Sequence, residues 1–199
     1  MSRKGKVDIN ESQVFNPNQI DILESEDRKT WQNPEEIIKH LELNPSTILV
    51  DLGCGGGYFS IPISSKVKKI YAIDVQKEML DYLENKIQKQ NIKNIETLLS
   101  KDNNIPIQSE SIDVLLSVNT FHEFQNRDSM INEICRVLKH KGKAVLVDFK
   151  KESTEFGPPL HIRISKEQAI DAFKKKGMIV IKTRDLLHQY VIVFQKEIR

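Results

Sequence analysis

One stretch decides the fold, and it reads Ile48-Leu49-Val50-Asp51-Leu52-Gly53-Cys54-Gly55-Gly56-Gly57-Tyr58. An apolar run of the kind found in buried strands leads directly into a cluster of glycines. Backbone without Cβ atoms approaches a ligand closely, and the N–H groups of a following helix point at a bound carboxylate or phosphate. The stretch predicts a strand that turns into a helix beside a ligand site.

The rest of the chain alternates strand patterns with helical patterns, which indicates a parallel sheet flanked by helices. We expect strands at 47–52, 70–74, 95–99, 112–118 and 144–149. Helices are expected near 34–43, 58–66, 76–90 and 127–139, and a further helix begins at a Ser165/Gln168 capping box and ends near Gly177. Two strands follow at 178–183 and 189–194, and the short link between them requires antiparallel pairing. The predicted fold class is α/β, with a doubly wound, mostly parallel seven-stranded sheet that ends in an antiparallel strand.

Composition limits the choice of function. The 199 residues are 39% hydrophobic and 29% charged with a net charge of +2, so we expect one globular domain and no dedicated nucleic-acid binder. Cys54 and Cys135 show no zinc or disulfide spacing, and no metal site is predicted. The basic N-terminus lacks the apolar segment of a secretory signal, and no apolar run is long enough for a membrane span, so we expect a cytoplasmic protein. The predicted domain covers residues 33–199, after a polar arm over residues 1–32.

The spacing of the glycines separates the ligand classes. A dinucleotide site of the G-x-G-x-x-G type would place its third glycine where Tyr58 stands, and a phosphate-binding P-loop would need a Gly-Lys-Ser/Thr ending that is absent. The order Asp51-x-Gly53-x-Gly55-x-Gly57 instead resembles the first motif of class I S-adenosylmethionine-dependent methyltransferases, with Cys54 inside the loop. An acid at the front of the loop suits a cofactor that carries an amine and a sulfonium.

The resemblance runs from about Asn33 to Phe194, including a turn at 138–143 before the fifth strand, and implies a Rossmann-like methyltransferase fold with S-adenosylmethionine as cofactor. It implies that Asp74, at the end of the second strand, binds the ribose hydroxyls. Val75 and Met79 would cover the adenine, although Met79 suits the helix core equally well. In the next segment, 102–103, Asp102 and Asn103 would meet the adenine amino group, unless Asp102 is a solvated loop acid. In the last one, Asn119 would lie at the methionine end of the cofactor. Ligands of open α/β sheets bind at the carboxyl ends of the strands, so these residues should converge.

Among class I enzymes the chain looks nearest to the ubiquinone/menaquinone-biosynthesis type, on the segments 74–80, 121–124 and 157–159. This resemblance implies a small-molecule methyl acceptor. A protein or RNA acceptor, or a protein that binds S-adenosylmethionine without turnover, remains the alternative. The segment Asn119-Thr120-Phe121-His122 lacks the Asn/Asp-Pro-Pro-Tyr/Phe motif of enzymes that methylate nucleobase amino groups.

His122 and Glu123 are the candidate catalytic residues, because they follow the fourth strand and histidine titrates near neutral pH. A purely structural role for His122 stays open. His161 and Arg163 are candidates for the same cleft.

Phe15 and Trp31 lie in the polar arm without a periodic partner, and we expect the arm to form part of the acceptor site as a lid. Alternatively, Trp31 fastens the first helix to the core.

Overall fold

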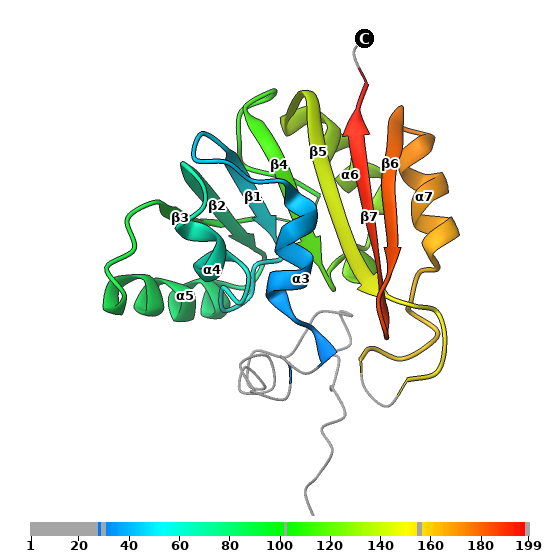
Figure 1. The fold of residues 1–199 in the computed structure, drawn as a ribbon, viewed down its shortest axis with the longest axis horizontal. Coiled ribbons are helices and arrows are strands. Elements are labelled where there is room, and N and C mark those ends of the chain that lie inside the picture. The colour runs from blue at the N-terminus through cyan, green and yellow to red at the C-terminus, as the bar shows by residue number, and fades with distance from the viewer. Residues whose placement is uncertain (1–27, 29–30, 102, 155–156, 198–199) are drawn as a thin grey trace, which may run out of the picture.

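A single mixed sheet forms the centre of the protein in the computed structural model, which describes residues 28, 31–101, 103–154 and 157–197. The strands are β1 Ile48–Leu52, β2 Lys69–Asp74, β3 Ile95–Leu99, β4 Ile112–Val118, β5 Leu138–Phe149, β6 Met178–Asp185 and β7 Gln189–Lys196. Their order across the sheet is β3-β2-β1-β4-β5-β7-β6. β7 runs antiparallel to both of its neighbours, while β1 to β5 pair in parallel. This confirms the predicted α/β class and the antiparallel final strand (Figure 1).

Helices lie before β1 and in the connections β1–β2, β2–β3, β4–β5 and β5–β6. They are α3 Pro34–Ile38, extended by the 3-10 turn η2 Lys39–Leu41, α4 Ser60–Ser64, α5 Lys77–Lys89, the 3-10 turn η3 Phe121–Glu123, α6 Arg127–Val137 and α7 Lys166–Lys174. The predicted start signals are confirmed: the Asn33 side chain caps α3, and Ser165 and Gln168 form a capping box on α7. Capping is important for α3, because a helix of five residues is not stable by itself.

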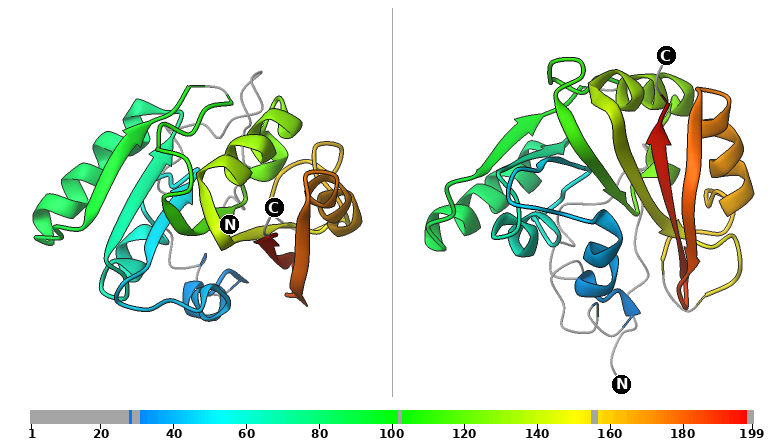
Figure 2. Two further views of the ribbon diagram at one scale, coloured as in Figure 1. Left: turned by 90° about the horizontal axis from the view of Figure 1, so that it is seen from above. Right: turned by 45° about the horizontal axis from the view of Figure 1, so that its top comes forward.

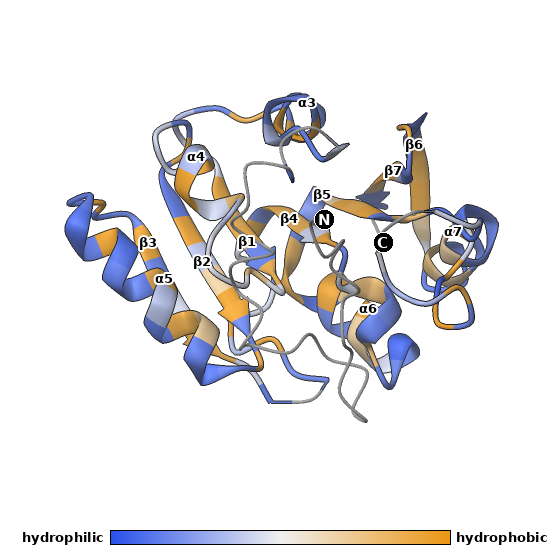
Figure 3. Ribbon diagram, turned by 90° about the horizontal axis from the view of Figure 1, so that it is seen from below, coloured by the Kyte–Doolittle hydropathy of each residue, from blue (hydrophilic) through white to orange (hydrophobic). Residues whose placement is uncertain are grey.

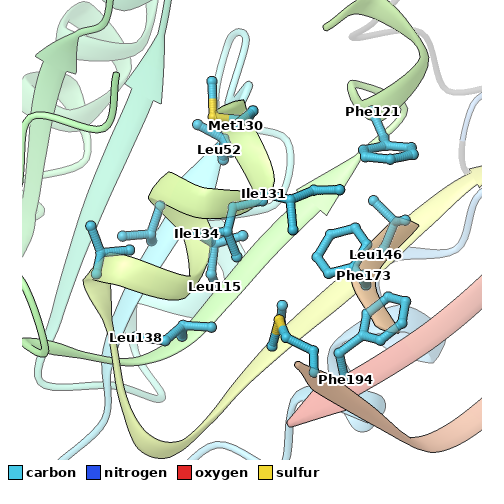
Figure 4. Packing of buried hydrophobic residues seen from close by; sticks show 14 of the residues in the cluster. Leu52, Leu115, Phe121, Met130, Ile131, Ile134, Leu138, Leu146, Phe173 and Phe194 are labelled. Carbon is cyan, nitrogen blue, oxygen red and sulfur yellow. The ribbon is translucent and has the colours of Figure 1, made fainter. Parts of the chain in front are cut away.

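The helices lie on both faces of the sheet (Figures 1 and 2). On one face, apolar side chains of α3, α4 and α5 pack on alternate residues of the central strands, such as Leu49 and Val145. On the other face, α6 and α7 pack on the intervening residues, with the Phe173 and Phe194 rings stacked 4.2 Å apart. Figure 4 shows this second cluster, and Figure 3 shows that the hydrophobic residues gather along the strands. Two filled cores therefore hold the carboxyl ends of the strands in a fixed arrangement.

β5 is longer than predicted, and the expected turn at 138–143 is part of it. Leu138 pairs with Ile112 and Lys143 with Val114, so the register shifts between these pairs. Gly142 fits in the irregularity because a Cβ there would stand 2.8 Å from the Lys139 carbonyl oxygen. The predicted helix 127–139 correspondingly ends at Val137.

The connection between β3 and β4 forms no helix in residues 100, 101 and 103–111. Leu99 at the end of β3 is accordingly 51% exposed. Within the described residues, no helix is long and apolar enough to cross a membrane.

Candidate cofactor and acceptor site

The glycine loop is tied to the neighbouring strand by backbone hydrogen bonds. Gly53 and Cys54 both donate their N–H groups to the Ile73 carbonyl, at 2.8 and 3.0 Å. Gly57 donates to Cys54, and Ile61 of α4 donates to Gly57, so the loop runs directly into the helix. The turn therefore has a fixed shape at the carboxyl edge of β1.

Two glycines are required by this shape. Gly53 has φ +76° and Gly57 has φ +83°, in the left-handed region that favours glycine. A Cβ on Gly53 would stand 2.3 Å from the Thr120 hydroxyl oxygen, and one on Gly57 would stand 2.3 Å from a Leu83 methyl carbon. The loops after β1 and β4 therefore touch at Gly53, which places the two predicted parts of the site side by side.

Asp51 lies under the loop and is 2% exposed. Its carboxylate accepts a 2.6 Å hydrogen bond from the Ser60 hydroxyl. Burial raises the pKa of Asp51 to about 6, while the bond from Ser60 and the charge of Arg28 oppose the rise. Burial thus moves the pKa of Asp51 toward neutral pH.

Asp74 closes the loop from the end of β2. One carboxylate oxygen accepts the Gly55 N–H at 2.9 Å and the other accepts the Gln76 N–H at 3.0 Å. Burial raises the pKa of Asp74. Val75, next along the chain, is 45% exposed and offers an apolar surface at this edge, whereas Met79 is 2% exposed and packed within the protein.

Asn119 directly follows β4, has φ +56° and donates its backbone N–H to the Val147 carbonyl of β5. Its side-chain oxygen accepts a hydrogen bond from Gln189, the fully buried first residue of β7. The Gln189 side-chain oxygen has no partner among the described residues. Asn103 is half-buried with φ +59°, and Asp102 lies outside the described residues.

His122 is held by Asp148 of β5. The His122 Nδ1 lies 2.8 Å from one Asp148 oxygen, and the other oxygen accepts the His122 backbone N–H at 3.1 Å. The Phe149 N–H also donates to Asp148, at 2.8 Å. Glu123 lies farther off, with its Oε1 4.0 Å from His122 Nε2. A carboxylate only accepts hydrogen bonds, so Nδ1 carries the proton in neutral His122 and Nε2 keeps its lone pair.

Arg163 is 4% exposed and anchors the loop after β5. Its guanidinium donates to the carbonyls of Pro158, Lys150 and Glu152 and to the Thr154 hydroxyl. It also lies 5.1 Å from the centre of the Phe149 ring. His161, from the same predicted pair, is exposed.

The described part of the arm reaches both halves of the site. The Arg28 guanidinium lies 3.9 Å from the centre of the Tyr58 ring, directly after the glycine loop, and its Nε donates to the Gln32 side chain. The Trp31 and Phe149 ring centres are 5.7 Å apart. Phe15 lies outside the described residues.

The strand order, the glycine turn after β1 and the acid after β2 define a class: this is the fold of class I S-adenosylmethionine-dependent methyltransferases. A family model described as a methyltransferase domain matches residues 50–146. The chain resembles a SAM dependent methyltransferase from Aquifex aeolicus at 28% identity and a TM-score of 0.86, over 92% of this chain and 99% of that one.

Two curated relatives support the same assignment. An uncharacterized methyltransferase-like protein of Schizosaccharomyces pombe is 37% identical over 113 residues, which are 56% of this chain and 42% of that protein. The ubiquinone/menaquinone biosynthesis C-methyltransferase of Wigglesworthia glossinidia brevipalpis is 25% identical over 140 residues, 68% of this chain and 55% of that enzyme. The chain thus spans about half the length of these two relatives. Residues 50–146 therefore form a methyltransferase domain, within the fold of S-adenosylmethionine-dependent methyltransferases.

The residues present fit this cofactor, because the turn at Gly53, Gly55 and Gly57 leaves backbone without side chains beside Asp74, next to the exposed apolar side chain of Val75. Three members of the site escaped the sequence analysis: Arg28, Asp148 and Gln189. A signal existed for Asp148, which is an acid inside the apolar run 144–149.

Proposed function

We propose that this methyltransferase acts on a small-molecule acceptor, bound at the carboxyl edge of β4 and β5. The observation that carries the proposal is the buried polar cluster there: His122 is 3% exposed, Asp148 is 1% exposed and Gln189 is fully buried. Polar side chains at this depth suit an acceptor that enters a pocket. The name of the relative from ubiquinone/menaquinone biosynthesis supports the same acceptor class.

The cofactor is proposed to lie across the carboxyl edge of β1 and β2. Gly53, Cys54, Gly55 and Gly57 would offer backbone to its methionine part, with the negative charge of Asp51 beneath them. Asp74 would bind the ribose. S-Adenosylmethionine supplies a methyl group already activated on a sulfonium, so the protein chiefly positions the acceptor and removes its proton where needed.

The remaining cofactor contacts stay predictions. Val75 would cover the adenine with its exposed side chain, while the buried Met79 would support it from the helix. Asn103 and Asp102 would meet the adenine amino group, and Asn119 the methionine end.

On the acceptor side, His122 and Glu123 are the proposed catalytic residues. The contact between Trp31 and Phe149 supports the proposal that the arm over residues 1–32 covers the acceptor, since Phe149 directly follows Asp148. The same contact supports the alternative in which Trp31 fastens the arm to the domain.

The test uses S-adenosylmethionine labelled in its methyl group and an extract of the producing cells, separated into low-molecular-weight and macromolecular fractions. We expect label in products of the low-molecular-weight fraction, and its loss with Asp74→Ala. Label in the macromolecular fraction alone would contradict the small-molecule acceptor. Cofactor binding without product from either fraction would favour a non-catalytic protein.

A further inference from the structure

The contact between His122 and Asp148 is more specific than packing requires. Two backbone N–H groups, from His122 and Phe149, and the imidazole Nδ1 all donate to one carboxylate. With three donors and 1% exposure, this carboxylate is fixed in position. The His122 ring is therefore held in one orientation and one neutral tautomer.

Several charges act on this ring. Burial lowers the pKa of His122, but the charge and hydrogen bond of Asp148, with a smaller contribution from Glu123, outweigh it, and the pKa is raised. Arg163, from the loop after β5, acts in the opposite direction. Arg127 of α6 donates to the His122 carbonyl at 3.2 Å. An imidazolium formed here is stabilised by the carboxylate directly behind it.

We propose that Asp148 is a positioning residue that makes His122 Nε2 a proton acceptor, and that the methyl acceptor is a hydroxyl compound that loses its O–H proton on reaction. The inference rests on the proposed function and names the acceptor class of that site. It adds to the candidate site a positioning residue that the sequence alone did not single out.

The chemistry balances without a further reactant. The hydroxyl oxygen forms a bond to the methyl carbon, the carbon–sulfur bond breaks with its electron pair left on the now neutral sulfur, and the hydroxyl proton passes to His122 Nε2. The arrangement follows the Ser-His-Asp pattern, in which the acid fixes the tautomer and stabilises the imidazolium without taking the proton.

Among possible acceptor groups, a hydroxyl depends most on a general base such as His122 with Asp148 behind it. Alcohols and phenols are weak nucleophiles at neutral pH until they lose a proton. A thiol ionises more readily, and a neutral amine attacks through a free lone pair. The buried carboxylate behind His122 therefore favours an oxygen acceptor over sulfur or nitrogen.

The first test measures the protonation of His122 beside Asp148 in the absence of any methyl acceptor. Nitrogen NMR of ¹⁵N-histidine-labelled protein, saturated with S-adenosylhomocysteine, should show His122 above its pKa with the proton on Nδ1. Asp148→Asn should lower the pKa of His122, because the negative charge behind the ring is removed. The exposed His140 provides the matched control, because His140→Gln should leave the His122 signals unchanged. A proton on Nε2 in the unmodified protein, or an unchanged His122 pKa in Asp148→Asn, would overturn the positioning role.

The second test identifies the atom that is methylated. With ¹³C-methyl cofactor and the low-molecular-weight extract, the carbon shift of the product should be that of a methyl group on oxygen. His122→Gln should slow its formation by about 100-fold or more, as expected for loss of a general base, with cofactor affinity within a few-fold. The acid limb of the pH–rate profile should move to lower pH in Asp148→Asn, a change that a merely structural role would not produce. His140→Gln should match the unmodified protein.

The outcomes separate the two proposals. A methyl group on nitrogen, sulfur or carbon would overturn the hydroxyl class and leave the small-molecule function standing. Label only in macromolecules, or none at all, would overturn the proposed function and with it the acceptor class, while the tautomer measurement would still decide the role of Asp148. Where His122→Gln fails to fold, the near-isosteric Asp148→Asn supplies the pH profile.

Discussion

Gly53→Ala should destabilise the protein and weaken cofactor binding together. Alanine at φ +76° costs about 1–2 kcal/mol in backbone conformation. Its Cβ would also stand 2.3, 2.4 and 2.8 Å from the Oγ1, Cγ2 and Cβ atoms of Thr120, so one of the two loops must move. Overpacking of this kind typically costs about 1–3 kcal/mol more. The free energy of unfolding should therefore fall by roughly 2–5 kcal/mol, the sum of these two ranges.

Thr120→Ala provides the matched second site. It removes the two closest atoms and costs only the hydrogen bond from the Thr120 hydroxyl to the Val118 carbonyl, about 0.5–1.5 kcal/mol. Combined with Gly53→Ala it should recover part of the loss, with a coupling of about 1 kcal/mol or more. Urea unfolding of all four proteins gives the cycle, and calorimetric titration with S-adenosylmethionine gives the binding loss. Additive free energies, or a Gly53→Ala protein as stable as the original, would refute the proposed contact between the loops.

Three further outcomes are expected. Asp74→Ala should weaken S-adenosylmethionine binding by about 1.5–3 kcal/mol, the usual contribution of hydrogen bonds to a charged group, and an unchanged dissociation constant would remove Asp74 from the site. Because the pKa of Asp51 is about 6, cofactor affinity should rise as pH increases through that value, and Asp51→Asn should abolish this dependence in titrations at several pH values. The raised pKa of His122 adds stability that is complete below its unfolded-state pKa and is lost as pH rises through the folded-state pKa. The stability difference between the protein and His122→Gln should therefore shrink in alkaline urea titrations, and a difference that grows would contradict the ion pair with Asp148.

Local sequence patterns predicted the fold well where neighbouring residues determine the structure. The apolar run before Gly53 became β1, and the Ser165 capping box became the start of α7, because adjacent residues determine both. Asp74 was placed at the end of β2 for the same reason. The start of β5 was missed because Leu138 extends the strand by pairing with Ile112, a long-range contact that no local pattern reveals.

The residues gathered around His122 and Asn119 are far apart in the sequence, so local patterns could not predict their contacts. His122 was singled out by its position after β4, but its partner Asp148 comes from the next strand of the sheet, and Gln189 comes from a strand that runs the opposite way. Sheet register brings these side chains together, and register follows from the packing of whole strands. Arg28 lies in a segment with no periodic pattern, so nothing in the sequence linked it to Tyr58.

The position of β7 has a consequence for how the molecule folds. β7 is the last strand in the sequence, yet it lies between β5 and β6, and its residues from Tyr190 to Phe194 are almost completely buried. Before β7 joins, β5 and β6 have no common partner, and the apolar edge of β5 is open to other chains. Pairing between strands as distant in the sequence as β5 and β7 slows folding and prolongs exposure to aggregation. Because Gln189 begins β7, the pairing that closes this edge also brings the Gln189 side chain to Asn119, beyond the end of β4.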